Sequence, residues 1–409
     1  WTPDNCELEV LRCSRPAGPA IHAPDNTPTH RAIEAAICIT AGIPETIVAQ
    51  GYDTKTMEMA TSLNLRGAGL HTLLYEVLRA AGHYVRPGRI DDEVIRAALV
   101  SDNRLIQASG GFTTLSLSGI LSNVANKTML AAYNAVSSVA TKICGTTDVN
   151  DFKEVTRYRM TGSGGFEKVG ADGELHHADL SEESYTNKVE TYGRLITLTR
   201  QMMINDDLGA FLQIPRAIGR MSALALEEAA FTLLLSNPDS FFSSGNKNYF
   251  AGITSALGID SLTKAEQMFL DRTDKAGKPI LIQPAILLTP TSLKVKAEQL
   301  YNEQPVNQVP ADAAKEIAVN PHSKKFRPVA SPYLNLSSLT GNSAAAWYLL
   351  ADPADVSFME IAYLRGRRTP VIESGTTDFN VLGMYWRGYF DFGVAMQDNR
   401  AAVKAKGEA

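Results

Sequence analysis

Residues 205–236 read NDDLGAFLQIPRAIGRMSALALEEAAFTLLLS, a stretch that predicts one long helix. Asn205 offers a side chain that can cap a helix, and the two carboxylates after it favour the positive end of the helix dipole. Pro215 is expected to restart or kink the helix. Apolar residues then recur on one face as far as Leu235. This pattern predicts a helix of roughly 31 Å, long enough to span a whole domain.

Two runs rich in β-branched and aromatic residues lie upstream of this helix, at 155–161 and about 184–199. Glycine-rich turns at 162–165 and 170–173 separate them, which predicts a long hairpin. Arms of about 15 residues would each reach roughly 50 Å. Because a two-stranded ribbon is marginally stable by itself in water, the hairpin is expected to need a partner outside its own chain.

The hairpin also carries a charge pattern. Arg157 and Arg159 lie in its first arm, and Glu174, Glu182 and Glu183 follow the tip. Cross-strand pairing within one hairpin explains this pattern. Complementarity between the hairpin and a neighbouring copy in a ring explains it equally well. The second interpretation makes these five residues candidate inter-subunit contacts.

The rest of the chain mixes helices and strands unevenly, so the predicted fold class is α+β. Helices are expected at 30–41 with Gly42 as the stop, within 70–78 and 94–99, at 121–143 and 261–270, and from Thr289-Pro290 to near Tyr301. Strands are expected at 280–282, 285–288, 345–350, 356–364 and 379–396, with a loop-like region at 302–343.

Composition excludes several classes of protein. The chain has 409 residues, of which 44% are apolar and 20% charged, with a net charge of −5. Such values are those of a globular protein and argue against a dedicated nucleic-acid binder, which is clearly basic. Four cysteines with no CxxC pair indicate a reduced compartment. No signal peptide and no apolar stretch long enough to span a bilayer is visible, so no membrane partner is predicted.

The motifs of catalysis are missing from the sequence. No phosphate-binding loop and no G-x-S-x-G are present, and the adjacent pair His176-His177 is expected in a solvated loop. No catalytic, cofactor-binding or metal-binding residue is therefore predicted, and the chain is not expected to be an enzyme. The basic clusters 365–368 and 324–327 could touch phosphates, but such clusters more often lie in solvated loops or meet acidic partners.

The order of these parts, together with local motifs, resembles the major capsid protein of tailed phages, the Hong Kong 97 fold. The match is most similar to the capsid portion of fused prohead protease–major capsid proteins and covers about residues 108–405. The motifs that carry it lie at 112–127 (FTTLSLSGILSNVANK), 190–194 (ETYGR), 199–209 (TRQMMINDDLG), 347–353 (WYLLADP) and 387–395 (RGYFDFGVA).

The resemblance implies a division of the chain. It comprises an extended strap at 1–29, a helical module at 30–107, an N-arm or linker and helix at 108–150, an E-loop hairpin at 151–199, a P-domain with the spine helix at 200–280, an A-domain at 281–378, and a returning P-domain strand with the tail at 379–409. Because the chain begins at Trp1 rather than Met, we expect its N-terminus to arise by proteolysis.

The resemblance also implies a function. Copies of the chain would assemble into hexamers and pentamers of an icosahedral shell around phage DNA. The expected partners are other copies, a portal, a scaffold or prohead protease, DNA on the inner face, and decoration proteins. The expected location is the virion, after assembly in the host cytoplasm. Two alternatives stay open, a tail or neck ring protein and a hydrolase with an unrecognised site.

Overall fold

The computed structural model describes residues 30–43, 45–62, 71–72, 74–75, 78, 117–163, 179–199, 201, 205, 208–273, 277–303, 305–308, 316–375 and 383–408. The chain divides into two compact units, Trp1–Ile120 and Leu121–Ala409. Within the expected helix at 70–78, the described residues 71, 72, 74, 75 and 78 are all helical. The expected helix within 94–99 and most of the hairpin tip fall outside the described residues.

The first unit is helical where it is described. Helices α2 (His30–Thr40), α3 (Glu45–Gly51) and α4 (Thr54–Thr61) follow one another. Helix α2 ends as the sequence predicts, because Gly42 has a φ of 73°, in the left-handed region that glycine tolerates. The hydroxyl of Tyr52 donates a hydrogen bond of 2.7 Å to Glu34 Oε1 and so connects α3 and its C-terminal turn to α2.

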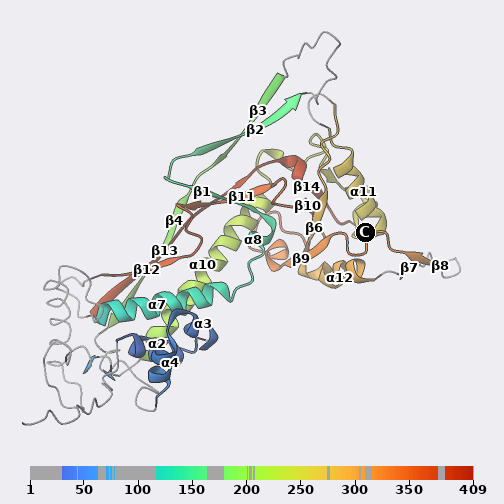
Figure 1. The fold of residues 1–409 in the computed structure, drawn as a ribbon. Helices are drawn as coiled ribbons and strands as arrows, with labels where there is room; N and C mark the ends of the chain where they lie inside the picture. The colour runs from blue at the N-terminus through green and yellow to red at the C-terminus, as the bar shows by residue number, and fades with distance from the viewer. Residues whose placement is uncertain are drawn as a thin grey trace, which may run out of the picture. The chain divides into compact units, whose positions relative to one another are not determined.

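The second unit contains two five-stranded sheets (Figure 1). In the first sheet, β13 (Gly383–Met396) is central. It pairs antiparallel with β4 (Glu190–Thr199) on one edge and with β11 (Met359–Leu364) and β12 (Val371–Gly375) on the other. Strand β1 (Gly145–Val149) adds to β11 in parallel. The predicted long strand ending at Met396 is confirmed as β13.

The second sheet has the order β5-β14-β10-β6-β9. Its strands are β5 (Tyr249–Phe250), β14 (Ala402–Ala405), β10 (Trp347–Ala351), β6 (Pro284–Pro290) and β9 (Arg327–Ser331). Strand β10 is buried along its whole length, and its Trp347 is part of the core cluster that fills this unit. The predicted strands at 285–288, 345–350 and 356–364 are thus confirmed to within a few residues.

Helix α10 (Leu208–Ser236) is the long helix predicted from residues 205–236, and it runs through Pro215 without ending. Phe231 and Leu234 bury its inner face in the core. Helix α7 (Leu117–Asn134) contacts α10 closely at Gly219, where a Cβ would lie 2.2 Å from the Met129 carbonyl oxygen. Only glycine permits this approach of the two backbones.

The remaining elements complete the α+β class that the sequence predicts. Helix α8 (Ala140–Ile143) follows α7, and α11 (Ile259–Leu270) and α12 (Lys294–Asn302) flank the second sheet. Short 3-10 turns occupy Pro238–Ser240, Ile253–Ser255, Thr291–Leu293, Pro332–Asn335 and Asn399–Ala401. Strands β2 (Val155–Ser163) and β3 (Asp179–Asn187) form one two-stranded ribbon, and β7 (Pro305–Gln308) and β8 (Glu316–Val319) form another.

Several sequence expectations are wrong in detail. The run 184–199 is not one hairpin arm, because the chain leaves β3 at Asn187 and enters the sheet as β4. The expected helix at 121–143 is divided between α7 and α8. Thr289 and Pro290 end strand β6, and the helix expected after them forms as the turn Thr291–Leu293 followed by α12, which ends at Asn302. No strand forms at 280–282. The loop-like region 302–343 contains three strands, which the prolines in and between them conceal.

Candidate assembly interface

The β2–β3 hairpin is attached to the sheet through its root, where three polar contacts meet. Arg157 Nη1 on β2 lies 3.2 Å from Glu360 Oε2 on β11. The same guanidinium donates a hydrogen bond to Thr147 Oγ1 on β1. Asn187, the last residue of β3, donates from Nδ2 to the Glu360 carbonyl oxygen at 3.3 Å. Both hairpin strands are therefore tied to the subunit's own sheet.

Burial makes this ion pair necessary. The Glu360 side chain is only 9% exposed, whereas Arg157 is half exposed. Desolvation raises the pKa of Glu360, and the positive charge of Arg157 and a hydrogen bond from Asn187 oppose that rise. A buried carboxylate without such a partner would be strongly destabilising. The pair fixes the position at which the hairpin leaves the sheet.

The structure distributes the five predicted contact residues unevenly. Arg157 is bound within its own subunit. In the backbone register, Arg159 faces Glu183 and Met160 faces Glu182 across the hairpin. Glu174 lies outside the described residues. This register places opposite charges across from each other only at Arg159 and Glu183, and both the cross-strand interpretation and an inter-subunit role for the five residues stay predictions.

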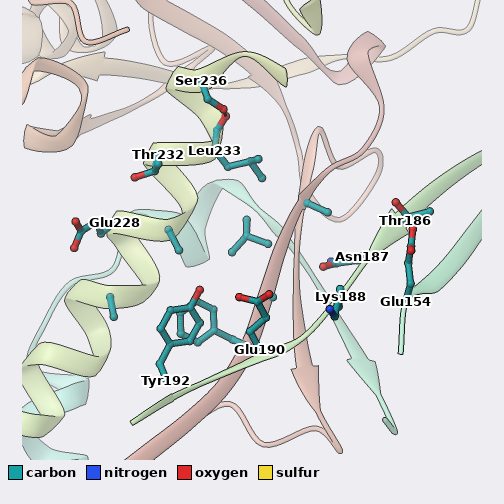
Figure 2. A pocket seen from close by; sticks show the side chains of 16 residues that line it. Glu154, Thr186, Asn187, Lys188, Glu190, Tyr192, Glu228, Thr232, Leu233 and Ser236 are labelled. Atoms are coloured by element: carbon teal, nitrogen blue, oxygen red, sulfur yellow. Dashed lines mark hydrogen bonds between the residues drawn. The ribbon is translucent and has the colours of Figure 1, made fainter. Parts of the chain in front are cut away.

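A groove opens between α10 and the strands β4 and β13 (Figure 2). Its volume is about 720 Å³, and a continuation of about 430 Å³ follows α10 toward Ile218 and Gly388. Glu228, Thr232 and Ser236 line the helix side, each one turn after the last. Glu190 and Tyr192 line the strand side.

The floor of the groove is apolar and its rim is acidic. Tyr192 stacks on Phe392 with the ring centroids 4.4 Å apart and the planes 13° from parallel. Burial and the nearby charge of Glu190 raise the pKa of the Tyr192 hydroxyl. Three exposed carboxylates, Glu154, Glu190 and Glu228, line this wider part, and Lys188 is its one cation. Within the part of the chain that the structure describes, none of these carboxylates forms an ion pair.

Apolar side chains are also exposed beside the groove. Met221 and Leu224 on α10 and Tyr192 on β4 are all more than a third exposed. Leu195, on the opposite face of β4, is 68% exposed. Sequence reasoning missed the groove because it assigned residues 184–199 to the hairpin. The pairing of the motif at 190–194 with that at 387–395 was the available signal, since the two motifs are neighbouring strands.

The described residues contain no cluster of three or more His, Cys, Asp or Glu side chains able to hold a metal ion. Among the same residues, no helix is long and apolar enough to cross a bilayer. Cys38 and Cys144 are buried and form no disulfide among the described residues.

A model of the phage capsid protein family matches residues 182–405, more than half of the chain. Known structures that resemble the chain include one of Microbacterium phage Oxtober96, with 11% identity over 66% of this chain and 91% of that one and a TM-score of 0.41. The mature capsid of bacteriophage PhiM1 has 12% identity, coverage of 66% and 87%, and a TM-score of 0.43. A virus-like particle from Pyrococcus furiosus has 11% identity over 68% of this chain and 96% of that one, with a TM-score of 0.42. No curated protein matches the sequence.

Proposed function

Because this chain belongs to the phage capsid protein family, we propose that it is a major capsid subunit that assembles into hexamers and pentamers of an icosahedral shell. The observation that carries the proposal is the family match, which runs from β3 to β14 and includes α10 and most of both five-stranded sheets. The shell would enclose phage DNA, and the chain would act as structure and not as a catalyst.

Physical features support this function. Ring-forming interfaces are heterologous, so one surface of a subunit must fit a different surface of the next copy. A ribbon of two nine-residue strands, reaching about 30 Å, gains little stability from its own pairing. The groove beside α10 leaves apolar rings and side chains in contact with water. Both features are costly in an isolated subunit and become favourable when another copy covers them.

The finer assignments belong to the same proposal. Residues 151–199 would supply the E-loop, 200–280 and 379–409 the P-domain, and 281–378 the A-domain near the ring axes. During assembly the subunit would meet a portal and a scaffold or prohead protease in the host cytoplasm, and decoration proteins could join the shell afterwards. The chain would correspond to the capsid portion of a fused prohead protease–major capsid protein.

Expression of the chain followed by size-exclusion chromatography and electron microscopy tests the proposal. We expect rings or closed shells of uniform diameter, built of hexamers and pentamers. A tail or neck protein would instead give rings of a single symmetry that never close. A small, fixed oligomer at every protein concentration and ionic strength would contradict the capsid assignment.

A further inference from the structure

Two surfaces of opposite charge lie on opposite sides of the central strand β13 of the first sheet. Phe392 on β13 pairs with Glu190 of β4 on one side and with Tyr363 of β11 on the other. The acidic groove lies between α10 and the strands β4 and β13, on the β4 side. On the other side of β13, residues 364–368 turn the chain from β11 toward β12; we call this segment the arginine turn.

The backbone of the arginine turn is well defined. Arg365 and Gly366 have φ values of 51° and 70°, and the Arg367 amide donates to the Leu364 carbonyl oxygen at 3.1 Å. Positive φ at both central residues is the geometry of a type I′ turn. The Arg365 amide donates to the Val149 carbonyl oxygen at 2.6 Å, which fastens the turn to β1. The backbone of the turn is thus held in one conformation and forms a fixed platform, from which its side chains project.

The platform presents three exposed guanidinium groups. Arg368 Nη2 lies 4.0 Å from Asp148 Oδ1, at the edge of ion-pair distance. Arg367 lies beside Tyr389 and Glu373, which are already bonded to each other at 2.7 Å. Arg365 has no ion pair and no side-chain hydrogen bond among the described residues. The Arg365 guanidinium is therefore available to bind a carboxylate of another molecule, and the positive charges of Arg367 and Arg368 are only partly neutralised.

The groove has the complementary charge. Three exposed carboxylates line it, against Lys188 in the wider part and Arg194 in the continuation, so acidic groups outnumber basic groups by three to two. Guanidinium groups suit such a site because they bind carboxylates through several donors and also stack on aromatic rings such as Tyr192. Inside one subunit the sheet separates the two surfaces. A head-to-tail arrangement of copies brings opposite edges together, which is the requirement of a heterologous ring contact.

We propose that the arginine turn of one copy binds in the acidic groove of the adjacent copy, with Arg365 directed at Glu228 and Glu190. This contact rests on the proposed function, since it is one of the lateral contacts within a ring. It would order subunits side by side, because the acidic groove of one copy attracts the arginine turn of the next copy and repels a second acidic groove.

Charge reversal tests the contact. Arg365→Glu and Glu228→Lys, each alone, are expected to raise the subunit concentration needed for particle formation by about tenfold or more, because each places like charges together. The double variant Arg365→Glu/Glu228→Lys is expected to restore particles. The matched control Arg365→Glu/Glu298→Lys has the same total charge, with the reversed carboxylate on α12, and is expected not to restore them. Circular dichroism and thermal unfolding confirm that each variant folds.

Cross-linking provides an independent measurement. Cys6 and Cys13 are replaced by Ser, and Arg365→Cys is combined with Glu228→Cys. A short bismaleimide is expected to produce a ladder of linked subunits in assembled particles, whereas Arg365→Cys with Glu298→Cys is expected to produce none.

The outcomes separate this contact from the proposed function. If the unaltered chain forms no rings or shells, the proposed function fails. If it does form them, but Arg365→Glu assembles normally and no ladder appears, the contact is wrong while the capsid function stands. If Arg365→Glu assembles normally and the particles retain less DNA, the arginine turn binds nucleic-acid phosphates, which also overturns the contact.

Discussion

Arg272, after the end of α11, is a buried arginine that hydrogen-bonds to carbonyl groups and lies over the Phe269 ring. It is 5% exposed, and it donates to the carbonyl oxygens of Met268, Asn399 and Ala402 at 3.2, 3.2 and 2.9 Å. Desolvation lowers its pKa to about 10, so the group stays charged at neutral pH. The fork of donors ties the C-terminal strand β14 to α11.

Replacing this side chain should therefore destabilise the second unit. We expect Arg272→Leu to reduce the free energy of unfolding by about 3 kcal/mol, because buried carbonyl oxygens lose their donors. Arg272→Lys should recover only a part, since an ammonium group cannot reproduce the fork. Urea unfolding of the unassembled subunit measures both values. The exposed control Arg327→Ala should stay within about 0.5 kcal/mol of the unaltered chain. Equal losses at both positions would contradict a specific role for Arg272.

We expect the buried side chain of Glu227 to make the free energy of unfolding depend on pH. It is 4% exposed on α10, and its Oε1 accepts hydrogen bonds from Ser138 Oγ at 2.5 Å and from the Ala140 amide at 2.8 Å. Burial is the largest influence and raises its pKa above the usual 4.5, although these hydrogen bonds oppose the rise. The folded state binds this proton more tightly than the unfolded state. The contribution of protonated Glu227 to the free energy of unfolding is therefore fully present below pH 4.5, and it is lost as the pH rises through the pKa of the folded state.

Glu227→Gln removes that titration and keeps an oxygen that can accept both hydrogen bonds. We expect the unaltered chain to lose more stability than Glu227→Gln between pH 4.5 and 7, measured as the difference in free energy of unfolding. Glu228→Gln, at the adjacent exposed position, is expected to retain the profile of the unaltered chain. Parallel pH profiles for the unaltered chain and Glu227→Gln would show that Glu227 does not titrate across folding.

Among the helices and strands, the sequence predicted those that their own residue patterns determine. Helix α10 and strand β13 have long, regular apolar periods, and each lies close to its expected position. Strand β4 was misassigned because a β-type run does not reveal its partner, and only the tertiary pairing with β13 separates it from the hairpin. Strands β7, β8 and β9 lie among prolines, so propensity indicated loops there. The groove depends on the β4 pairing and was missed with it.

The hairpin gives a prediction at this scale. Among the described residues its two strands pair with each other and with no further strand, and its root is fixed by Arg157 and Glu360. Replacing residues 164–178 by a two-residue turn leaves this root and the core unchanged. We expect a soluble subunit with unaltered circular dichroism that forms no closed shells, because the shortened hairpin no longer reaches the neighbouring copy. Normal particles would contradict the intermolecular role, and failure to fold would place the hairpin within the subunit's own core.

At the scale of the whole molecule, the chain divides at residues 120 and 121 into two compact units. The core of the second unit is continuous, joining α8, α10, both five-stranded sheets and the C-terminal strand β14 through buried side chains. A unit of nearly 290 residues is large enough to bury such a core by itself. The family match at 182–405 also lies entirely inside this unit.

We therefore expect a fragment of residues 117–409, which retains all of α7, to fold without the first unit. Its thermal unfolding should be cooperative, and its midpoint should lie within a few degrees of the main transition of the full chain, because that transition reports the same core. Residues 30–107 should melt separately in the full chain, since their α2–α4 helices pack on one another. Differential scanning calorimetry of both proteins measures this. A single transition in the full chain, absent from the fragment, would mean that the two units depend on each other to fold.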